Sequence, residues 1–210
     1  MEPIAHLRLV EKSEPPEYDE QTLKVHNENS GKYAAEALRC IELDKVGSFC
    51  GNIHDLGKAT KKFFDYIQPG NTLRRGEVNH TFAAVRYIFE LSDGVDNEVR
   101  ELLAYAVGAH HGQFDAVNDD HKNGFEHRLT KDGIDYDEAK KNFNEHCFSD
   151  AELKSQFDGA AEQLTEIIAG IRERNPKRSA RQAEEYEFQI SLLARLLLSA
   201  VIEGDRRDTA

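Results

Sequence analysis

The tract His54-Asp55-Leu56-Gly57-Lys58 places an imidazole, a carboxylate and an ammonium side by side. Neighbouring residues on a helix are ~100° apart around its axis, so the adjacent histidine and aspartate can both reach one metal ion placed between them. Gly57 would let the chain leave the helix close to that ion, and Lys58 would add a cation beside it. Because a histidine-aspartate pair occurs by chance in many sequences, the tract alone is more typical of an ordinary helix end.

Four further histidines and one aspartate fall on inward faces or ends of segments with helical periodicity. They are His26, His80, His110, His111 and Asp205. A buried imidazole needs a polar partner, and a buried carboxylate is costly unless it is paired or bound to a metal. One buried histidine is usually a satisfied core residue, but this explanation does not suit so many at once. The set therefore predicts a metal centre that also includes His54 and Asp55.

Helices must position these side chains, because apolar residues recur every three or four positions and no segment shows strong strand alternation. The sequence predicts helices over residues 20–43, 46–57, 63–67, 77–92, 97–111, 135–146, 149–174 and 180–206, the last of them the most apolar and central. Residues 1–19 and 113–134 are predicted to be irregular. We expect an all-α fold, in which residues 1–210 form a single compact helical domain with the metal site between central helices.

Composition excludes several classes of protein. Of the 210 residues, 39% are hydrophobic and 31% are charged, which argues against a disordered chain. No apolar run approaches the ~20 residues needed to cross a bilayer, and the first residues lack the features of a secretory signal. Cys40, Cys50 and Cys147 have no metal-binding spacing and are expected to be reduced thiols. We therefore expect a cytoplasmic protein with no membrane partner.

The net charge of −12, from 27 basic and 39 acidic residues, argues against a protein that binds DNA by electrostatic attraction alone. It does not exclude nucleic acid as a substrate, because bound divalent metals reverse the local sign of a carboxylate site and a partner could deliver the strand. Lys61 and Lys62 could guide a phosphate backbone, although an exposed helix face explains them nearly as well. A second basic cluster is better explained as a solvated loop; it comprises Arg172, Arg174, Lys177, Arg178 and Arg181.

Taken in chain order, the motifs resemble the HD metal-dependent phosphohydrolase superfamily, and within it the HD nuclease domain of the signature nuclease-helicase of type I CRISPR systems. The resemblance spans nearly the whole chain. Its motifs are Ile4-Ala5-His6-Leu7-Arg8, Gln21-Thr22-Leu23 before His26, His54-Asp55-Leu56-Gly57-Lys58-Ala59-Thr60, His80, Gly108-Ala109-His110-His111-Gly112 and Glu203-Gly204-Asp205-Arg206-Arg207-Asp208-Thr209. Each motif is weak alone, whereas the ordered set is specific.

The resemblance implies two divalent metal ions. The ligands of the first match His26, His54, Asp55 and Asp205, and those of the second match His80, His110 and His111, with Asp55 bridging both. Lys58 matches a basic residue beside the metals, and we expect Asp55 and Lys58 to be catalytic. The usual Asp-Ala-Asp of the family is replaced by Glu203-Gly204-Asp205, so the ligand is placed at Asp205 and Glu203 has no assigned role. The many imidazoles favour Mn, Fe, Co, Ni or Zn, with Mg as a further alternative.

Two such ions ~3.5–4 Å apart suit the hydrolysis of a phosphodiester, since they activate a water and stabilise charge on the phosphoryl oxygens. Lys58 would neutralise a non-bridging oxygen. The resemblance implies a nuclease that acts on single-stranded DNA during CRISPR interference. Its expected partners are a helicase domain, fused or separate, and the RNA-guided surveillance complex, so the chain could be the N-terminal part of a longer protein.

Two other functions compete with this one. An HD phosphohydrolase acting on nucleotides or cyclic dinucleotides would use the same ligands. Against it, Gly112-Gln113-Phe114-Asp115 lacks the Gly-Tyr-Pro element of the cyclic-dinucleotide enzymes. A non-catalytic docking module would need no converging set of ligands.

Overall fold

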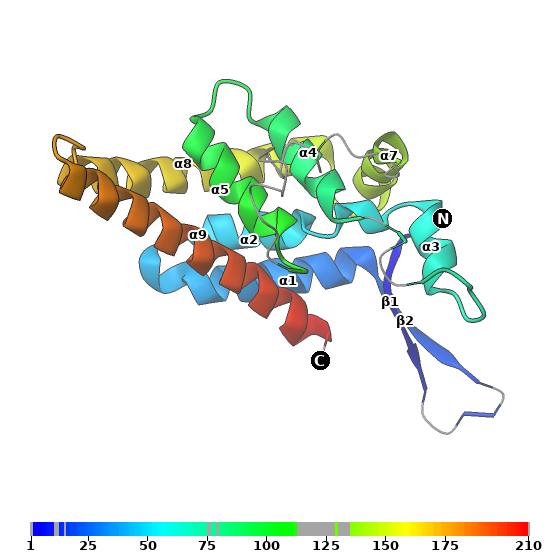
Figure 1. Cartoon of the computed structure of the whole chain (residues 1–210). Helices are drawn as coiled ribbons and strands as arrows, with labels where there is room; N and C mark the ends of the chain where they lie inside the picture. Colours follow the sequence, from blue (N-terminus) through cyan, green and yellow to red (C-terminus); the bar gives the residue numbers. More distant parts are fainter. Residues whose placement is uncertain are drawn as a thin grey trace.

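The computed structural model describes residues 2–10, 13–14, 16–74, 77–78, 80–112, 129 and 135–209, and helices dominate it (Figure 1). The elements are β1 (Ile4–Leu9), β2 (Tyr18–Thr22), α1 (Leu23–Leu38), η1 (Arg39–Ile41), α2 (Asp44–Ile53), η2 (Leu56–Lys58), α3 (Lys61–Ile67), α4 (Thr81–Leu91), α5 (Asn97–Gly108), α7 (Tyr136–His146), α8 (Asp150–Arg174) and α9 (Ala180–Thr209). The predicted compact helical fold is confirmed. Nearly all of the predicted loop over 113–134, including residues 113–115, lies outside the described residues.

The sequence predicts an irregular N-terminal segment. The structure instead shows a hairpin that projects from the helices (Figure 1). Strands β1 and β2 pair antiparallel with Leu7 opposite Glu20, and the register shifts between Ile4 and His6. Burial declines along β1 from Ile4 to Leu9 and does not alternate, and β2 is mostly exposed. The prediction is wrong because burial is confined to the start of β1 and does not alternate along either strand, so no period of two is visible.

Side chains next to the helix starts explain why several helices begin where they do. Thr22 Oγ1 accepts a hydrogen bond from the Val25 N–H at the start of α1. The carboxylate of Asp96 accepts from the Glu98 N–H at the start of α5. Helix α8 begins with a reciprocal capping box between Ser149 and Glu152. Each cap satisfies a backbone N–H that has no partner within the helix.

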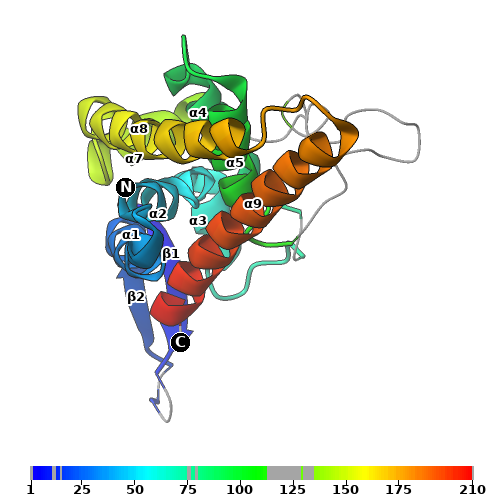
Figure 2. The same ribbon diagram turned by 90° about the vertical axis from the view of Figure 1, so that its left-hand side faces the viewer.

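Three helices approach one another closely because glycines line their contacts. A Cβ atom on Gly51 of α2 would lie 2.5 Å from the Gly31 Cα of α1, and one on Gly204 of α9 would lie 2.4 Å from the Ser30 carbonyl oxygen. Helix α9 crosses α1 and α5, and its C-terminal end lies beside α1 (Figure 2). The close packing brings together the segments that carry His26 and Asp205.

The apolar core includes side chains of α1, α2, α4, α5, α8 and α9; helices α1, α5 and α8 pack against α2, and α4 packs against α5. Phe49 of α2 and Phe157 of α8 meet edge to face, with ring centroids 5.6 Å apart. Within the described part of the chain, no helix is both long enough and apolar enough to cross a membrane. The core fixes α2 and α5, whose C-terminal ends carry most of the predicted metal ligands.

Replacing Gly57 with alanine should loosen the fold at the predicted metal site. The new Cβ would lie 1.9 Å from the backbone oxygen of His80, so one of the two segments must move. We expect Gly57→Ala to lower the free energy of unfolding by about 2 kcal/mol, which is a fall of ~4–8 °C in Tm for a chain of this size.

Gly170→Ala is the matched control, because its Cβ would meet only the end of the Arg174 side chain at 3.4 Å. This change within α8 should leave the stability unchanged or raise it by up to ~1 kcal/mol. Thermal melts followed by circular dichroism at the α-helix signal would measure both variants. Equal Tm values for Gly57→Ala and the unchanged protein would contradict the close approach of Gly57 to His80.

Candidate metal centre

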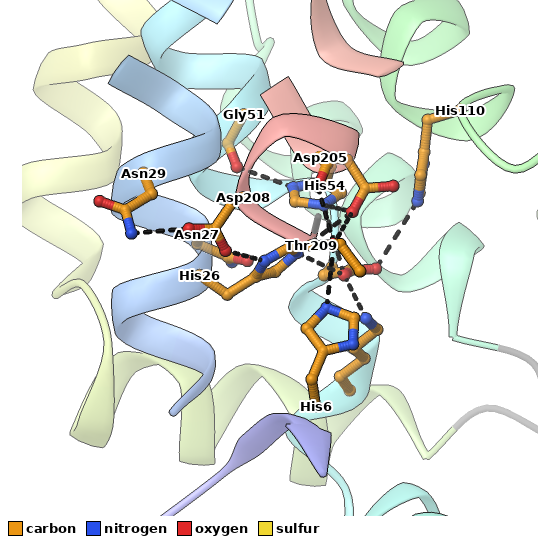
Figure 3. Close-up of polar contacts among 12 residues, drawn as sticks. His6, His26, Asn27, Asn29, Gly51, His54, His110, Asp205, Asp208 and Thr209 are labelled. Carbon is orange, nitrogen blue, oxygen red and sulfur yellow. Dashed lines mark hydrogen bonds and ion pairs between the residues drawn. The ribbon is translucent and has the colours of Figure 1, made fainter. Parts of the chain in front are cut away.

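Seven predicted ligands from separate parts of the sequence meet at one place in the fold. His26 comes from α1, His54 and Asp55 follow α2, His80 precedes α4, His110 and His111 follow α5, and Asp205 lies near the end of α9. His80 is thus the residue before a helix, and not on the helical stripe that the sequence predicts for residues 77–92. Figure 3 shows His26, His54, His110 and Asp205 pointing toward one another.

The donor atoms form two groups that share Asp55. One group contains His26, His54, Asp55 and Asp205, and the other contains Asp55, His110 and His111; within each, the ligand atoms lie within 4.8 Å of one another. Asp55 Oδ2 is 3.3 Å from both His26 Nε2 and His54 Nε2. Asp55 Oδ1 faces the other side, at 3.6 Å from His110 Nε2 and 3.9 Å from His111 Nε2. The two oxygens of one buried carboxylate therefore face different histidines.

His80 belongs with the second group. Its Nε2 lies 3.8 Å from Asp55 Oδ1 and 2.8 Å from His111 Nε2. Two imidazole nitrogens at this distance must share a proton or face a common cation. His80 therefore extends the group of Asp55, His110 and His111.

Hydrogen bonds to the other ring nitrogen orient three of these histidines. His54 Nδ1 lies 2.7 Å from the Gly51 carbonyl oxygen, and His110 Nδ1 lies 2.5 Å from that of Val107. A carbonyl oxygen can only accept, so each of these nitrogens carries the proton. His26 Nδ1 makes a corresponding contact with a carboxylate. When each ring is neutral, Nε2 is then the acceptor, and it is the atom that could bind a metal.

The donor set fits a divalent cation. The Nε2 atoms of His26, His54 and His110 are buried without a hydrogen-bond partner, and so are both oxygens of Asp55. Lys58 Nζ approaches Asp55 Oδ2 to 2.6 Å, but the contact is an ion pair without hydrogen-bond geometry. Buried acceptors left unsatisfied destabilise a fold, and a divalent ion in each group would satisfy them.

Charge is distributed unevenly over the two groups. Burial lowers the pKa of His54, but the carboxylates of Asp55 and Asp205 outweigh it and raise the pKa to about 10. Burial lowers the pKa of His80 to about 4, and burial together with the nearby His110 lowers that of His111 to about 3. Without metal, the group containing His54 therefore binds a proton at neutral pH, whereas His80 and His111 are neutral.

Solvent exposure differs among the residues of this centre. The side chains of His26, His54, Asp55 and His110 are fully buried. The His111 side chain is 43% exposed, and those of His80 and Asp205 are 17% exposed. Among these ligands, His111 is therefore the most accessible to a substrate.

Several of the basic residues singled out in the sequence form ion pairs with carboxylates of the protein. The Lys61 ammonium pairs with Asp65 at 2.5 Å. Arg172 pairs with Asp96 and Glu98, and its guanidinium joins α8 to the start of α5. Arg181 lies 24 residues before Asp205 on α9, which is ~36 Å along a helix. The second basic cluster is thus remote from the centre, and these contacts favour a structural role for it.

Two polar residues beside the centre have no role in the sequence-based prediction. Asp208 contacts His26 Nδ1 at 2.6 Å from the last turn of α9. His6 of β1 meets the His26 ring edge to face with centroids 4.7 Å apart. Asp208 could have been identified from the sequence, because it lies one helical turn after the predicted ligand Asp205. His6 could not, because it is the β1–β2 hairpin that brings it beside His26.

Metal ions should stabilise the protein and displace protons as they bind. Because the raised pKa keeps His54 protonated at pH 7, binding Mn²⁺ or Ni²⁺ should release about one proton or more per molecule. Titration calorimetry in two buffers of different ionisation enthalpy would measure this release. The free energy of unfolding should rise by about 2.7 kcal/mol at 100 times the Kd, which melts in EDTA and in added metal would show. A binding heat independent of buffer would contradict a protonated His54.

Comparison with known proteins gives a family. No curated protein sequence matches the chain. The family model described as "Cas3, HD domain" matches residues 20–200. This range contains six of the seven predicted ligands, and Asp205 follows it by a few residues. The chain belongs to the Cas3 HD domain family of metal-dependent phosphohydrolases and nucleases.

Proposed function

We propose that this chain hydrolyses phosphodiester bonds of single-stranded DNA during CRISPR interference, with two divalent metal ions bound at its centre. The observation that carries the proposal is the pair of donor groups that share the buried Asp55 carboxylate. A carboxylate between two imidazole clusters suits two adjacent cations better than one, because each of its oxygens faces a different cluster. Family membership supports a nucleic acid as the substrate.

The protein would hold the first ion with His26, His54, Asp55 and Asp205, and the second with Asp55, His80, His110 and His111. When bound, the two ions supply an activated water and stabilise the charge that develops on the phosphate. The imidazoles of His54 and His110 are directed by hydrogen bonds that their Nδ1–H groups donate, so little reorganisation is needed there. Burial of Asp55 and His54 excludes bulk water from the inner side of the site.

Lys58 contributes an ammonium group to this centre. Its side chain is 6% exposed, and its ammonium lies between Asp55 Oδ2 and the ring of Phe63, 5.5 Å from the ring centroid. We infer that bound cations compete with Lys58 for the carboxylate, and that the ammonium then neutralises a non-bridging oxygen of the scissile phosphate. Lys58 would in this way stabilise charge in the transition state.

The second candidate function is hydrolysis of nucleotides or cyclic dinucleotides at the same centre. A direct comparison would offer the protein a single-stranded oligonucleotide, a cyclic dinucleotide and a mononucleotide, each with Mn²⁺, Ni²⁺, Co²⁺ or Mg²⁺. We expect cleavage of the oligonucleotide to dominate under every metal that supports activity. Preferential hydrolysis of the cyclic dinucleotide would overturn the proposal in favour of the second function.

The wider setting is also part of the proposal. We expect this domain, over residues 1–210, to work in the cytoplasm with a helicase, fused or separate, and with an RNA-guided surveillance complex. The support for this setting is the match to the Cas3 HD domain. A docking module without catalysis is disfavoured by the convergence of seven potential ligands on one place.

A further inference from the structure

The last turn of α9 places two aspartates on opposite edges of one histidine ring (Figure 3). Asp208 Oδ2 contacts His26 Nδ1 at 2.6 Å. His26 Nε2, on the other edge, faces Asp55 Oδ2 at 3.3 Å and Asp205 Oδ1 at 3.4 Å. The Asp208 side chain is 5% exposed, so the contact is shielded from solvent. The arrangement separates a carboxylate that faces the metal centre from one that faces away from it.

His26 requires an acceptor from elsewhere in the fold, unlike two other histidines of the centre. His54 and His110 follow the ends of their helices, and each reaches a carbonyl oxygen three residues earlier, those of Gly51 and Val107. His26 lies inside α1, where the carbonyl oxygens of the helix are occupied by its own N–H groups. Its Nδ1 atom is therefore satisfied only through tertiary structure.

The Asp208 carboxylate is itself held on both oxygens. Gln21 Nε2 donates to Oδ2 at 2.7 Å, and Asn29 Nδ2 donates to Oδ1 at 2.7 Å. A carboxylate fixed in this way cannot turn toward the centre without breaking these bonds. Asp205 belongs to a donor group and Asp208 belongs to neither. Asp208 is therefore placed to orient a ligand and not to be one.

We propose that Asp208 is a positioning residue of the metal centre: it holds His26 with the proton on Nδ1 and directs Nε2 toward the ion shared with His54, Asp55 and Asp205. This inference rests on the proposed function. A carboxylate that accepts the Nδ1–H hydrogen bond also makes the imidazole more basic, and so a stronger metal ligand, than a neutral carbonyl does. Asp208 thereby couples the last turn of α9 to the affinity of one metal position.

Removing the charge of Asp208 should weaken one of the two metal positions. Outer partners of metal-bound histidines are worth ~10–100-fold in affinity, so we expect Asp208→Asn to raise the Kd for Mn²⁺ by about 10-fold and Asp208→Ala by more. The position formed by His80, His110 and His111 should be unchanged. Calorimetric titration of the full chain with Mn²⁺ would resolve the two metal positions. Cleavage lost at low Mn²⁺ should return at high Mn²⁺, which a damaged fold would not allow.

Glu203→Gln is the matched control, because it removes a carboxylate from the same end of α9 whose side chain is 56% exposed and pairs only loosely with Arg207 at 4.0 Å. It should leave Mn²⁺ binding unchanged. A folded Asp208→Asn protein with the original Kd would overturn the inference, and so would an equal loss in Glu203→Gln. If the unchanged protein bound no Mn²⁺, the proposed function would fall as well, so the two failures are distinguishable.

The His26 tautomer gives a test that does not depend on metal. In the metal-free protein, long-range nitrogen–proton NMR of labelled histidine should show His26 protonated on Nδ1. Asp208→Ala should change that signal and leave the His110 signal in place. If Asp208→Ala does not fold, the signal of the unchanged protein still decides the matter, because a His26 without a proton on Nδ1 would overturn the inference.

Discussion

An Asp55→Asn variant should lose hydrolysis almost completely while keeping its helical fold. Asp55 is the one carboxylate common to both donor groups, and its oxygens face histidines on opposite sides. An amide keeps the shape but removes the charge and one acceptor, so both metal positions weaken together. We expect the rate to fall by ~10³-fold or more, beyond the ~10–100-fold typical of outer partners. A nuclease assay in Mn²⁺ would measure the loss, and circular dichroism would report the fold.

Asp65→Asn is the control for this change. Asp65 lies on α3 with a side chain that is 53% exposed and pairs with Lys61. An exposed pair of this kind contributes little to stability, so both the fold and the rate should be preserved. Cleavage by a folded Asp55→Asn protein at near its original rate would rule out a shared carboxylate and, with it, the two-metal proposal.

The sequence predicts the helices of the centre well because each carries its own local signal. Apolar periodicity locates α1, α4, α5 and α9, and α5 begins at Asn97 as predicted. His26 and His110 fall on buried faces, where a polar residue stands out. The side chains that meet at the centre were identifiable for the same reason, since burial of several titratable groups is costly without a partner.

Features held by tertiary contacts were not predictable in this way. Burial along the β1–β2 hairpin falls off from Ile4 and does not alternate, so it leaves no hydrophobic period. His80 was expected within a helix, yet it precedes α4, where its backbone packs against Gly57. Asp208 meets His26 across 182 positions of the chain, and only the packing of α9 on α1 reveals it. Local pattern gives the residue types of the centre, whereas long-range packing gives their orientation.

The isolated domain should cut single-stranded DNA and leave blunt duplex largely intact. The Asp55 carboxylate is buried, and the more exposed His111 and His80 lie 3.9 and 3.8 Å from its Oδ1. A phosphodiester must therefore come close to buried ligands, which a flexible strand can do by bending locally. A duplex is stiff over ~150 base pairs, and bending a short stretch costs on the order of 1–6 kcal/mol. At 1.4 kcal/mol per factor of ten, a difference of ~100-fold in rate is expected.

Charge leads to the same expectation. The chain carries a net charge of −12, and Lys61 and Arg172 are already paired within the protein. A chain with this net negative charge should attract two phosphate strands only weakly, so duplex binding should be weak.

A single duplex with a 3′ or 5′ single-stranded overhang tests this preference and contains its own control, because strand and duplex are present in the same molecule at the same concentration. Trimming should stop near the junction. Cleavage should continue into the paired region only when a helicase and ATP supply an unwound strand. Rapid cutting of a blunt duplex by the purified chain, with Mn²⁺ but neither partner nor ATP, would contradict both the argument from burial of the ligands and the argument from charge. The phosphate contacts would then have to come from a surface other than the one bordered by His111 and His80.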